Sequence, residues 1–248
     1  MNCTIITCTF NSERTLRGTL ESVRSQRISD IEHLIIDGGS TDGTLAIVGE
    51  FTHVAGLISE PDKGLYDAMN KGIARATGEV IGILNSDDLY ANSEVISQVM
   101  ELFQHPGVDA VYGDLEFVHP HDTSRVIRTW RSGHYSARSF YWGWMPPHPT
   151  FFVRRSVYEK YGTFDTRLAR AADYELMLRF LLKNKVSAAY LPQVLVKMRM
   201  GGLSTSTFSG RIQANREDRV AWTLNGLRPL PWTLLLKPLR KLGQYHWR

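Results

Sequence analysis

Two adjacent carboxylates follow a short apolar run in the first half of the chain. Asp87 and Asp88 end the segment 84–88 (LNSDD), and residues 80–84 (VIGIL) are short and β-rich, which predicts a buried strand. Like charges this close disfavour each other's ionisation unless a cation lies between them. A hard divalent cation with oxygen ligands, one that also holds phosphates, is the simplest candidate.

Further polar groups follow the other predicted strands. Strands at 4–7, 33–36, 57–59, 80–84 and 109–112 alternate with helices near 16–23, 44–51, 66–73 and 94–103. This order predicts an α/β fold with a mostly parallel sheet flanked by helices. Ligands of such sheets bind at the carboxyl ends of the strands. We therefore expect one rim to collect residues 9–11, 37–42, 60–63, Asp87 and Asp88.

Two turns on this rim carry further chemistry. The turn 37–44 (DGGSTDGT) is either a plain loop or a place where Asp37 accepts hydrogen bonds from a nucleobase or ribose. It lacks the third glycine of the dinucleotide fingerprint. In the segment 59–72, Asp67 suits a helix N-terminus, and Lys63 in the preceding turn suits contact with a pyrophosphate.

Regular patterning weakens over residues 116–149, which are rich in aromatics and histidines. We expect this segment to cross the sheet edge where an acceptor could bind. His119 and His121 lack a metal-binding pattern and are expected at the surface. Order returns with residues 150–153, a helix from Ala172 or Asp173 to Lys183, and a strand at 191–200. Asp173 either caps its helix or acts in catalysis.

The bulk composition favours one large α/β domain. The chain has 248 residues and only two cysteines, Cys3 and Cys8, so a disulfide framework is not expected and a reducing cytosolic setting is favoured. The start does not resemble a signal peptide, and no apolar run has the length to cross a bilayer.

The basic residues gather towards the end of the chain. The formal net charge is +4. After Arg211 the sequence contains seven further Arg and Lys residues but only two acidic residues, Glu217 and Asp218. Residues 231–242 mix apolar and basic side chains with Trp232. This segment either packs on the core or lies as an anchor on a membrane surface. No nucleic acid partner is expected, because the basic residues alternate with leucines rather than forming a reading motif.

The segments 37–44, 60–72 and 85–88, taken in this order and spacing, resemble the family 2 glycosyltransferases with a GT-A (Rossmann-like) fold. The likeness covers about residues 3–204 and is greatest to bacterial enzymes of exopolysaccharide synthesis, such as those for colanic acid. It implies a GT-A domain at 1–204, with a nucleotide-sugar-binding half (1–115) and an acceptor and catalytic-base half (116–204). Residues 201–204 resemble a family loop after the last core strand. A basic, amphipathic helical extension occupies 205–248.

The resemblance also implies roles for individual residues. It makes Asp173 the catalytic base and places His148 and Glu175 on the acceptor side. It makes Asp87 and Asp88 ligands of Mn²⁺ or Mg²⁺, although Asn85 replaces the usual first acid of the motif, which predicts weaker metal binding. Binding of the donor falls to the following residues: Thr9, Asn11, Asp37, Asp62, Lys63, Asn70 and Asp87.

The expected function is metal-dependent, inverting transfer of a hexose from a nucleotide-diphosphate sugar. The acceptor would be a hydroxyl of a glycan or of a polyprenyl-diphosphate-linked glycan, at the cytoplasmic face of the bacterial inner membrane. One alternative is a sugar nucleotidyltransferase, which would open with a Gly-rich, Arg-containing loop where this chain has residues 9–14 (TFNSER). The other is a non-catalytic nucleotide-sugar-binding protein, in which a base such as Asp173 would have no use.

Overall fold

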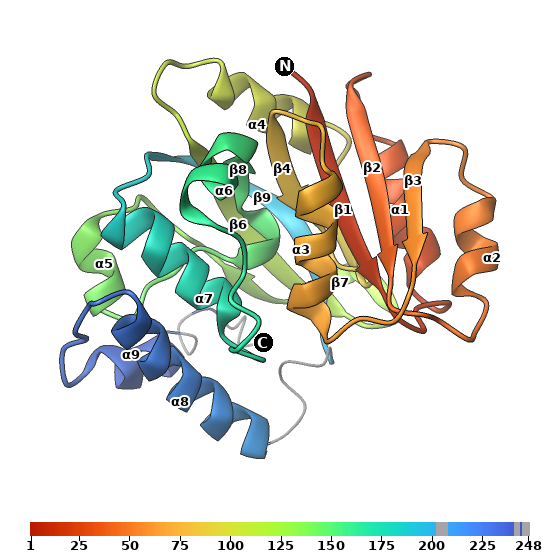
Figure 1. Ribbon diagram of the computed structural model, residues 1–248. Helices are drawn as coiled ribbons and strands as arrows, with labels where there is room; N and C mark the ends of the chain where they lie inside the picture. Colours follow the sequence, from red (N-terminus) through yellow and green to blue (C-terminus); the bar gives the residue numbers. More distant parts are fainter. Residues whose placement is uncertain (202–207, 241–243, 245–248) are drawn as a thin grey trace.

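The first four strands form the parallel part of the sheet in the computed structural model, which describes residues 1–201, 208–240 and 244 (Figure 1). All seven residues of β1 are buried, because α3 covers one face of the strand and other elements cover the opposite face. The strands and their connecting helices are β1 (Cys3–Thr9), α1 (Leu16–Arg24), β2 (Ile31–Asp37), α2 (Thr44–Gly49), β3 (Val54–Ser59), α3 (Leu65–Arg75) and β4 (Val80–Ile83).

The remaining strands make the sheet mixed. The strand order is β3-β2-β1-β4-β8-β6-β9-β5, and β7 pairs with β6. Strands β8 and β5 run antiparallel to their neighbours, whereas β6 and β9 are parallel. The elements after β4 are β5 (Asp88–Tyr90), α4 (Val95–Phe103), β6 (Ala110–His119), β7 (Asp122–Trp130), α5 (Ala137–Tyr141), η1 (His148–Thr150), β8 (Phe152–Arg154), α6 (Arg155–Tyr161), α7 (Ala172–Met177), η2 (Leu178–Lys183), β9 (Ala188–Arg199), α8 (Phe208–Leu224) and α9 (Thr233–Leu239).

The α/β prediction is confirmed, and three local expectations are corrected. Residues 116–130 are regular rather than loose, because β6 extends to His119 and pairs with β7 as a hairpin. The single helix expected up to Lys183 changes to π-helical hydrogen bonding at Leu178. The sequence pattern predicts no strand directly after the acidic pair, but Asp88 starts β5, which pairs with β9. A sheet edge can supply a partner strand that local patterning does not reveal.

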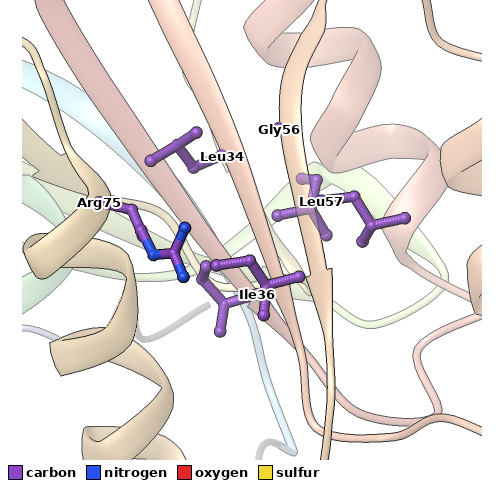
Figure 2. A pocket seen from close by; sticks show the side chains of 7 residues that line it. Leu34, Ile36, Gly56, Leu57 and Arg75 are labelled. Atoms are coloured by element: carbon purple, nitrogen blue, oxygen red, sulfur yellow. The ribbon is translucent and has the colours of Figure 1, made fainter.

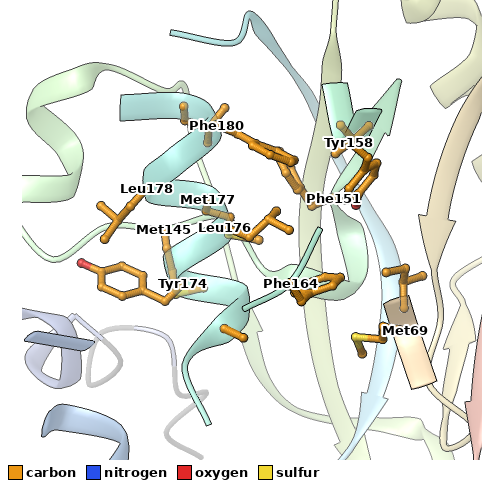
Figure 3. Close-up of a cluster of buried hydrophobic side chains, with 14 of the residues drawn as sticks. Met69, Met145, Phe151, Tyr158, Phe164, Tyr174, Leu176, Met177, Leu178 and Phe180 are labelled. Atoms are coloured by element: carbon orange, nitrogen blue, oxygen red, sulfur yellow. The ribbon is translucent and has the colours of Figure 1, made fainter. Parts of the chain in front are cut away.

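The core has two large apolar clusters, one on each face of the sheet, and a smaller third one between β2, α1 and α2. On one face, β4 and β6 pack with α4, and on the other face α3, α6 and α7 share a large cluster. Figure 3 shows part of the second cluster, with Leu176 and Met177 of α7 on the side of the helix towards Phe151, and Tyr174 on its other side. Helix α3 lies close against β1, and Gly72 allows this approach: a Cβ there would lie 2.5 Å from Ile6 Cγ2.

The C-terminal helices pack against α7. Trp222 of α8 is fully buried, and its Nε1 donates a hydrogen bond to the Tyr174 hydroxyl at 3.0 Å. Lys237 of α9 forms an ion pair with Asp218 of α8 at 2.7 Å. Residues 202–204 of the predicted family loop lie outside the described residues. No helix within the described ranges combines the length and apolarity that crossing a bilayer requires.

Candidate active site

The predicted rim begins with three residues in register at the ends of parallel strands. Thr9 of β1 pairs with Asp37 of β2, and Asp37 pairs with Ser59 of β3. The hydroxyls of Thr9 and Ser59 both donate to the Asp37 carboxylate, at 2.9 and 2.7 Å. The turn after β2 adds the backbone N–H groups of Gly39 and Ser40 and the Ser40 hydroxyl. Parallel strand ends thus build a cradle for one carboxylate.

Asp37 is fully buried and its two oxygens accept five hydrogen bonds. Burial raises the pKa of the Asp37 carboxyl, but the hydrogen bonds from Ser40, Ser59 and Thr9 outweigh it and hold this pKa below its usual value. Asp37 therefore keeps a buried negative charge that shapes the turn. Contact of this carboxylate with the donor base stays a prediction.

The loops after β1 and β2 are fastened to each other. Asn11 takes a left-handed conformation (φ 49°), which asparagine tolerates better than most residues. Its backbone N–H donates to Ser40 Oγ at 2.8 Å, and its side-chain oxygen accepts from the Thr41 N–H at 2.9 Å. The side-chain oxygen of Asn11 is thus used within the loop, and its predicted contact with the donor remains untested.

The turn that carries the acidic pair is held from three directions. Thr19 of α1 donates to the backbone oxygens of Ser86 and Asp88, at 3.0 and 2.8 Å. The Ser86 hydroxyl lies 2.8 Å from that of Ser12, in the loop after β1. Arg199, at the end of β9, donates from Nη1 to the Asp87 backbone oxygen at 2.6 Å. The backbone of the turn is thereby fixed next to the rim formed by β1 and β2.

The two carboxylates of the pair occupy different environments. Asp88 is fully buried, and its Oδ2 accepts a hydrogen bond from Asn85 Nδ2 at 3.0 Å. Burial, and then the charge of Asp87, raise the pKa of Asp88 well above its usual range. Asp87 is only partly buried, and its carboxylate accepts no hydrogen bond from another residue in the described part of the chain. Asp87 is thus the more accessible carboxylate. Asp88 positions Asn85 through Oδ2, whereas its buried Oδ1 has no hydrogen-bond partner among the described residues, and its predicted contact with a metal stays a prediction.

The oxygens around this turn are of the kind that bind a hard divalent cation. Besides the Asp87 carboxylate, two buried oxygens, Asn85 Oδ1 and Asp88 Oδ1, have no hydrogen-bond partner among the described residues. One carboxylate suffices for a cation that keeps waters and phosphate oxygens. Within the same residues, no three His, Cys, Asp or Glu side chains form a closed metal cluster. The oxygens present fit an open site completed by a ligand.

The turn between β3 and α3 brings Asp62 and Lys63 to the rim. Asp62 Oδ1 accepts from the Gly64 N–H at 2.8 Å, and its other oxygen lies over Gly38, where a Cβ would approach to 2.5 Å. Lys63 is exposed, and its ammonium forms no ion pair within the described residues. Asp67 instead accepts from the Lys63 backbone N–H at 3.0 Å. The Lys63 side chain therefore remains available to an anionic ligand.

Asn70 has a different role from the one predicted. Its amide Nδ2 donates to the Phe164 backbone oxygen, and its Oδ1 accepts from the Phe164 N–H, both at 2.9 Å. Both polar groups of Asn70 are thus used to fix the segment before α7 against α3. We therefore assign Asn70 to positioning rather than to contact with the donor.

Asp173 lies where the two halves of the chain meet. Tyr66, three residues after Lys63, donates from its hydroxyl to Asp173 Oδ1 at 3.1 Å. Burial and the Asp173 charge raise the pKa of Tyr66, so the phenol stays a donor. The Phe164 ring stacks on Tyr66 at 5.4 Å and meets the edge of His148 at 5.5 Å. The Tyr66 side chain therefore links the predicted base to the first turn of α3, which directly follows Lys63.

His148 belongs to the same cluster. It is partly buried in η1, and burial lowers the pKa of its imidazole below the usual value while the Asp173 charge offsets part of that effect. The ring is therefore neutral near pH 7. The structure places His148 against Phe164, close enough for the Asp173 charge to act on its ring, and its acceptor-side role stays a prediction.

Glu175 does not reach the site. It is 4% exposed and accepts two hydrogen bonds from Arg179, at 3.0 and 2.8 Å, and a third from Asn225, directly after α8, at 3.0 Å. Arg179 also donates to the backbone oxygens of Tyr161 and Thr163, just before Phe164. The acceptor-side prediction for Glu175 is therefore corrected: successive helical positions point in different directions, and this one faces the interior.

Sequence reasoning missed Tyr66 as a partner of Asp173, and it missed Arg199 entirely. Tyr66 and Asn70 are four residues apart and so lie on one face of the same helix, and this spacing was the available signal for Tyr66. Arg199 had no local signal, because it reaches the acidic turn from a strand more than 100 residues away.

A cavity elsewhere is unrelated to this rim. It is lined by Leu34, Ile36, Gly56 and Leu57 of the two outer strands, with Arg75 at the end of α3 (Figure 2). Its lining is apolar apart from Arg75 and includes none of the rim residues. It therefore does not bear on the chemistry of the rim.

Structural neighbours share the arrangement of these elements. TarS of S. aureus, in a 1–349 fragment bound to UDP-GlcNAc, superposes with a TM-score of 0.70 at 18% identity, covering 91% of this chain and 65% of the fragment. The chain spans 39% of the longer TarS structure. The mannosyltransferase PcManGT of Pyrobaculum calidifontis, in complex with GDP-Man and Mn²⁺, gives 0.67 at 19% identity, covering 95% and 68%. At this identity the likeness concerns the fold, and it confirms the predicted GT-A architecture.

Sequence comparisons identify the family. An uncharacterised glycosyltransferase of Mycobacterium tuberculosis is 36% identical over 185 residues, which are 72% of this chain and 68% of the relative. A PGL/p-HBAD biosynthesis glycosyltransferase of Mycobacterium bovis is 28% identical over 219 residues, covering 82% and 78%. Residues 4–162 match the model of the family described as glycosyl transferase family 2. The chain therefore belongs to glycosyl transferase family 2.

Proposed function

We propose that this glycosyltransferase moves a hexose, with inversion, from a nucleotide-diphosphate sugar to a hydroxyl of a surface glycan, free or carried on a polyprenyl diphosphate. The observation that carries the proposal is the hydrogen bond from Tyr66 to Asp173. It joins a carboxylate on α7 to the first turn of α3, directly after Lys63. A candidate base and a candidate diphosphate-binding cation thus lie on adjoining parts of one rim.

In the proposed reaction, the Asp173 carboxylate takes the proton of the acceptor hydroxyl. The hydroxyl oxygen then bonds to the anomeric carbon from the side opposite the leaving group. The bond between that carbon and the diphosphate oxygen breaks, and its electron pair leaves with the nucleoside diphosphate. An α-linked donor therefore gives a β-linked product, and the proton remains on Asp173.

The donor would lie along the rim formed by β1, β2 and β4. Asp37, whose oxygens already accept five hydrogen bonds, would exchange one of these for a hydrogen bond from the base. Thr9 and Asn11 would shape the adjoining loop, and Asp62 the turn before α3. Lys63 would compensate charge on the departing diphosphate. Asp87, with the unpartnered Asn85 oxygen beside it, would hold Mn²⁺ or Mg²⁺, and such an ion supplies Lewis-acid stabilisation of the leaving group.

The neighbours suggest which donors to test first. TarS was crystallised with UDP-GlcNAc and PcManGT with GDP-Man, so UDP and GDP sugars form the first panel. The mycobacterial relative of PGL/p-HBAD biosynthesis supports an acceptor destined for the cell surface. An exopolysaccharide of the colanic acid type and a place at the cytoplasmic face of the inner membrane remain part of the proposal.

The test is release of nucleoside diphosphate, measured with and without acceptor, for wild type and Asp173→Asn. Loss of a general base typically lowers the rate by about 10² to 10⁴. We expect a loss of at least about 100-fold, with the affinity for the nucleoside diphosphate unchanged in calorimetry. Asp165→Asn is the matched control, since Asp165 lies before the same helix and pairs with the exposed Arg167. Near-normal turnover of Asp173→Asn would show that the base lies elsewhere.

A further inference from the structure

Helix α9 presents an apolar stripe to solvent. Leu235 is 66% exposed and Leu239 is 55% exposed, and with Trp232 they recur at helical spacing on one side of α9. The opposite side holds Thr233 and Leu234, which are buried. The helix is thus fastened to the protein on one side and leaves its other side without a partner in the described chain.

A second helix extends this stripe. Trp142 directly follows α5, is 52% exposed, and lies with its ring 5.9 Å from the Trp232 ring. The Thr233 hydroxyl donates to the Tyr141 backbone oxygen at 2.7 Å, which fixes α9 to the end of α5. Figure 1 shows α5 and α9 on the same side of the molecule. We call the surface formed by Trp142, Trp232, Leu235 and Leu239 the tryptophan–leucine surface.

The sequence stretches that carry this surface have charges of one sign. Residues 131–158 and 219–248 contain no Asp or Glu, and the second stretch contains six Arg and Lys. In the described part of the chain, Arg138 on α5, Arg228 in the loop before α9 and Arg240 directly after α9 are exposed. The nearby acid Asp218 is buried in its ion pair with Lys237, so it does not offset these charges at the surface.

We infer that the tryptophan–leucine surface docks on a bilayer that contains anionic lipids. Tryptophan and leucine on one side of a surface helix, flanked by arginine, match the interfacial region of a bilayer, where aromatic rings lie among headgroups and cations meet anionic phosphates. An exposed apolar stripe can also bind a second copy of the chain, and the light-scattering measurement below separates that occupant from lipid.

The surface is connected to the helix that carries Asp173, and the importance of this connection rests on the proposed function. Helix α8, which carries the ion pair to α9, also hydrogen-bonds through Trp222 to Tyr174, the residue after Asp173. The docked face therefore adjoins the helix that carries the proposed base.

The experiment is sedimentation of the full chain with vesicles, with no enzymatic readout, so its failure is distinct from failure of the proposed function. We expect wild type to bind vesicles in which about 30% of the lipid is phosphatidylglycerol, because its anionic headgroups attract basic residues. Binding to neutral phosphatidylcholine vesicles should be at least about tenfold weaker. The variant Leu235→Gln/Leu239→Gln should lose at least about tenfold in binding. Leu57→Gln, at a 46% exposed position on β3, is the matched control and should bind as wild type does.

A second variant and a second signal make the result decisive. Arg228→Ala/Arg240→Ala should reduce binding to anionic vesicles and remove most of its salt dependence. Tryptophan emission should shift to the blue on binding, and Trp232→Phe should diminish that shift. Unchanged binding by the leucine variant would overturn the inference. So would a wild-type dimer in light scattering that the leucine variant abolishes, because the surface would then join two copies.

Discussion

Replacing Glu175 decides between the role predicted from sequence and the role found in the structure. The acceptor-side role predicts lost transfer in a stable protein, whereas the buried ion pair with Arg179 predicts lost stability. Glu175→Gln keeps the size of the side chain and removes the charge. The Arg179 guanidinium, whose side chain is 16% exposed, would then lack its counter-charge.

The magnitude follows from the burial. Removing one partner of a buried ion pair typically costs about 3–5 kcal/mol, because the other charge is left uncompensated. Arg179 keeps some solvent contact and two backbone acceptors, at Tyr161 and Thr163, so we expect a value near the lower end, about 3 kcal/mol. For a chain of this size that corresponds to a fall in Tm of roughly 6–12 °C.

The assay is denaturant unfolding together with transfer kinetics, measured where both proteins are folded. Glu159→Gln is a close control, since Glu159 pairs with Arg155 at the same i,i+4 spacing, but with side chains 57% and 42% exposed. It should change stability by no more than about 0.5 kcal/mol. A Glu175→Gln protein that is as stable as wild type but inactive in transfer would refute the assignment of Glu175 to a stabilising ion pair.

Two further predictions concern the sheet and the acidic turn. Burial, and then the charge of His53, lower the pKa of His33 to about 3, so that below about pH 6.5 the unfolded chain binds a proton that the folded chain does not. The free energy of unfolding should therefore decrease as the pH is lowered between these values, by up to about 1.4 kcal/mol per pH unit. His33→Gln should reduce this dependence in unfolding curves at pH 5 and 7, and an unchanged dependence would assign it to other groups. Arg199→Met removes a positive charge beside Asp87 and should tighten Mn²⁺ binding several-fold in electron paramagnetic resonance titrations, whereas weaker binding would show that Arg199 chiefly holds the turn in place.

Much of the rim could be predicted from local patterns. Short apolar runs followed by turn residues located β1 to β4 and the ends where Thr9, Asp37 and Asp87 lie, because strands buried on both faces have to be apolar along their length. Parallel pairing then requires those ends to meet at one edge. The same local logic failed for residues 116–130, where the partners β6 and β7 are joined as a hairpin beside distant strands.

The sequence by itself determined the residue types at the strand ends and the order of the elements, and through them the family. Only the tertiary structure decided what each polar group meets. It turned Asn70 towards Phe164 and buried Glu175 against Arg179, and it brought Arg199 to Asp87 and Tyr66 to Asp173. The reason is physical: periodicity fixes which side of an element a residue occupies, but packing between segments far apart in the chain determines its partner.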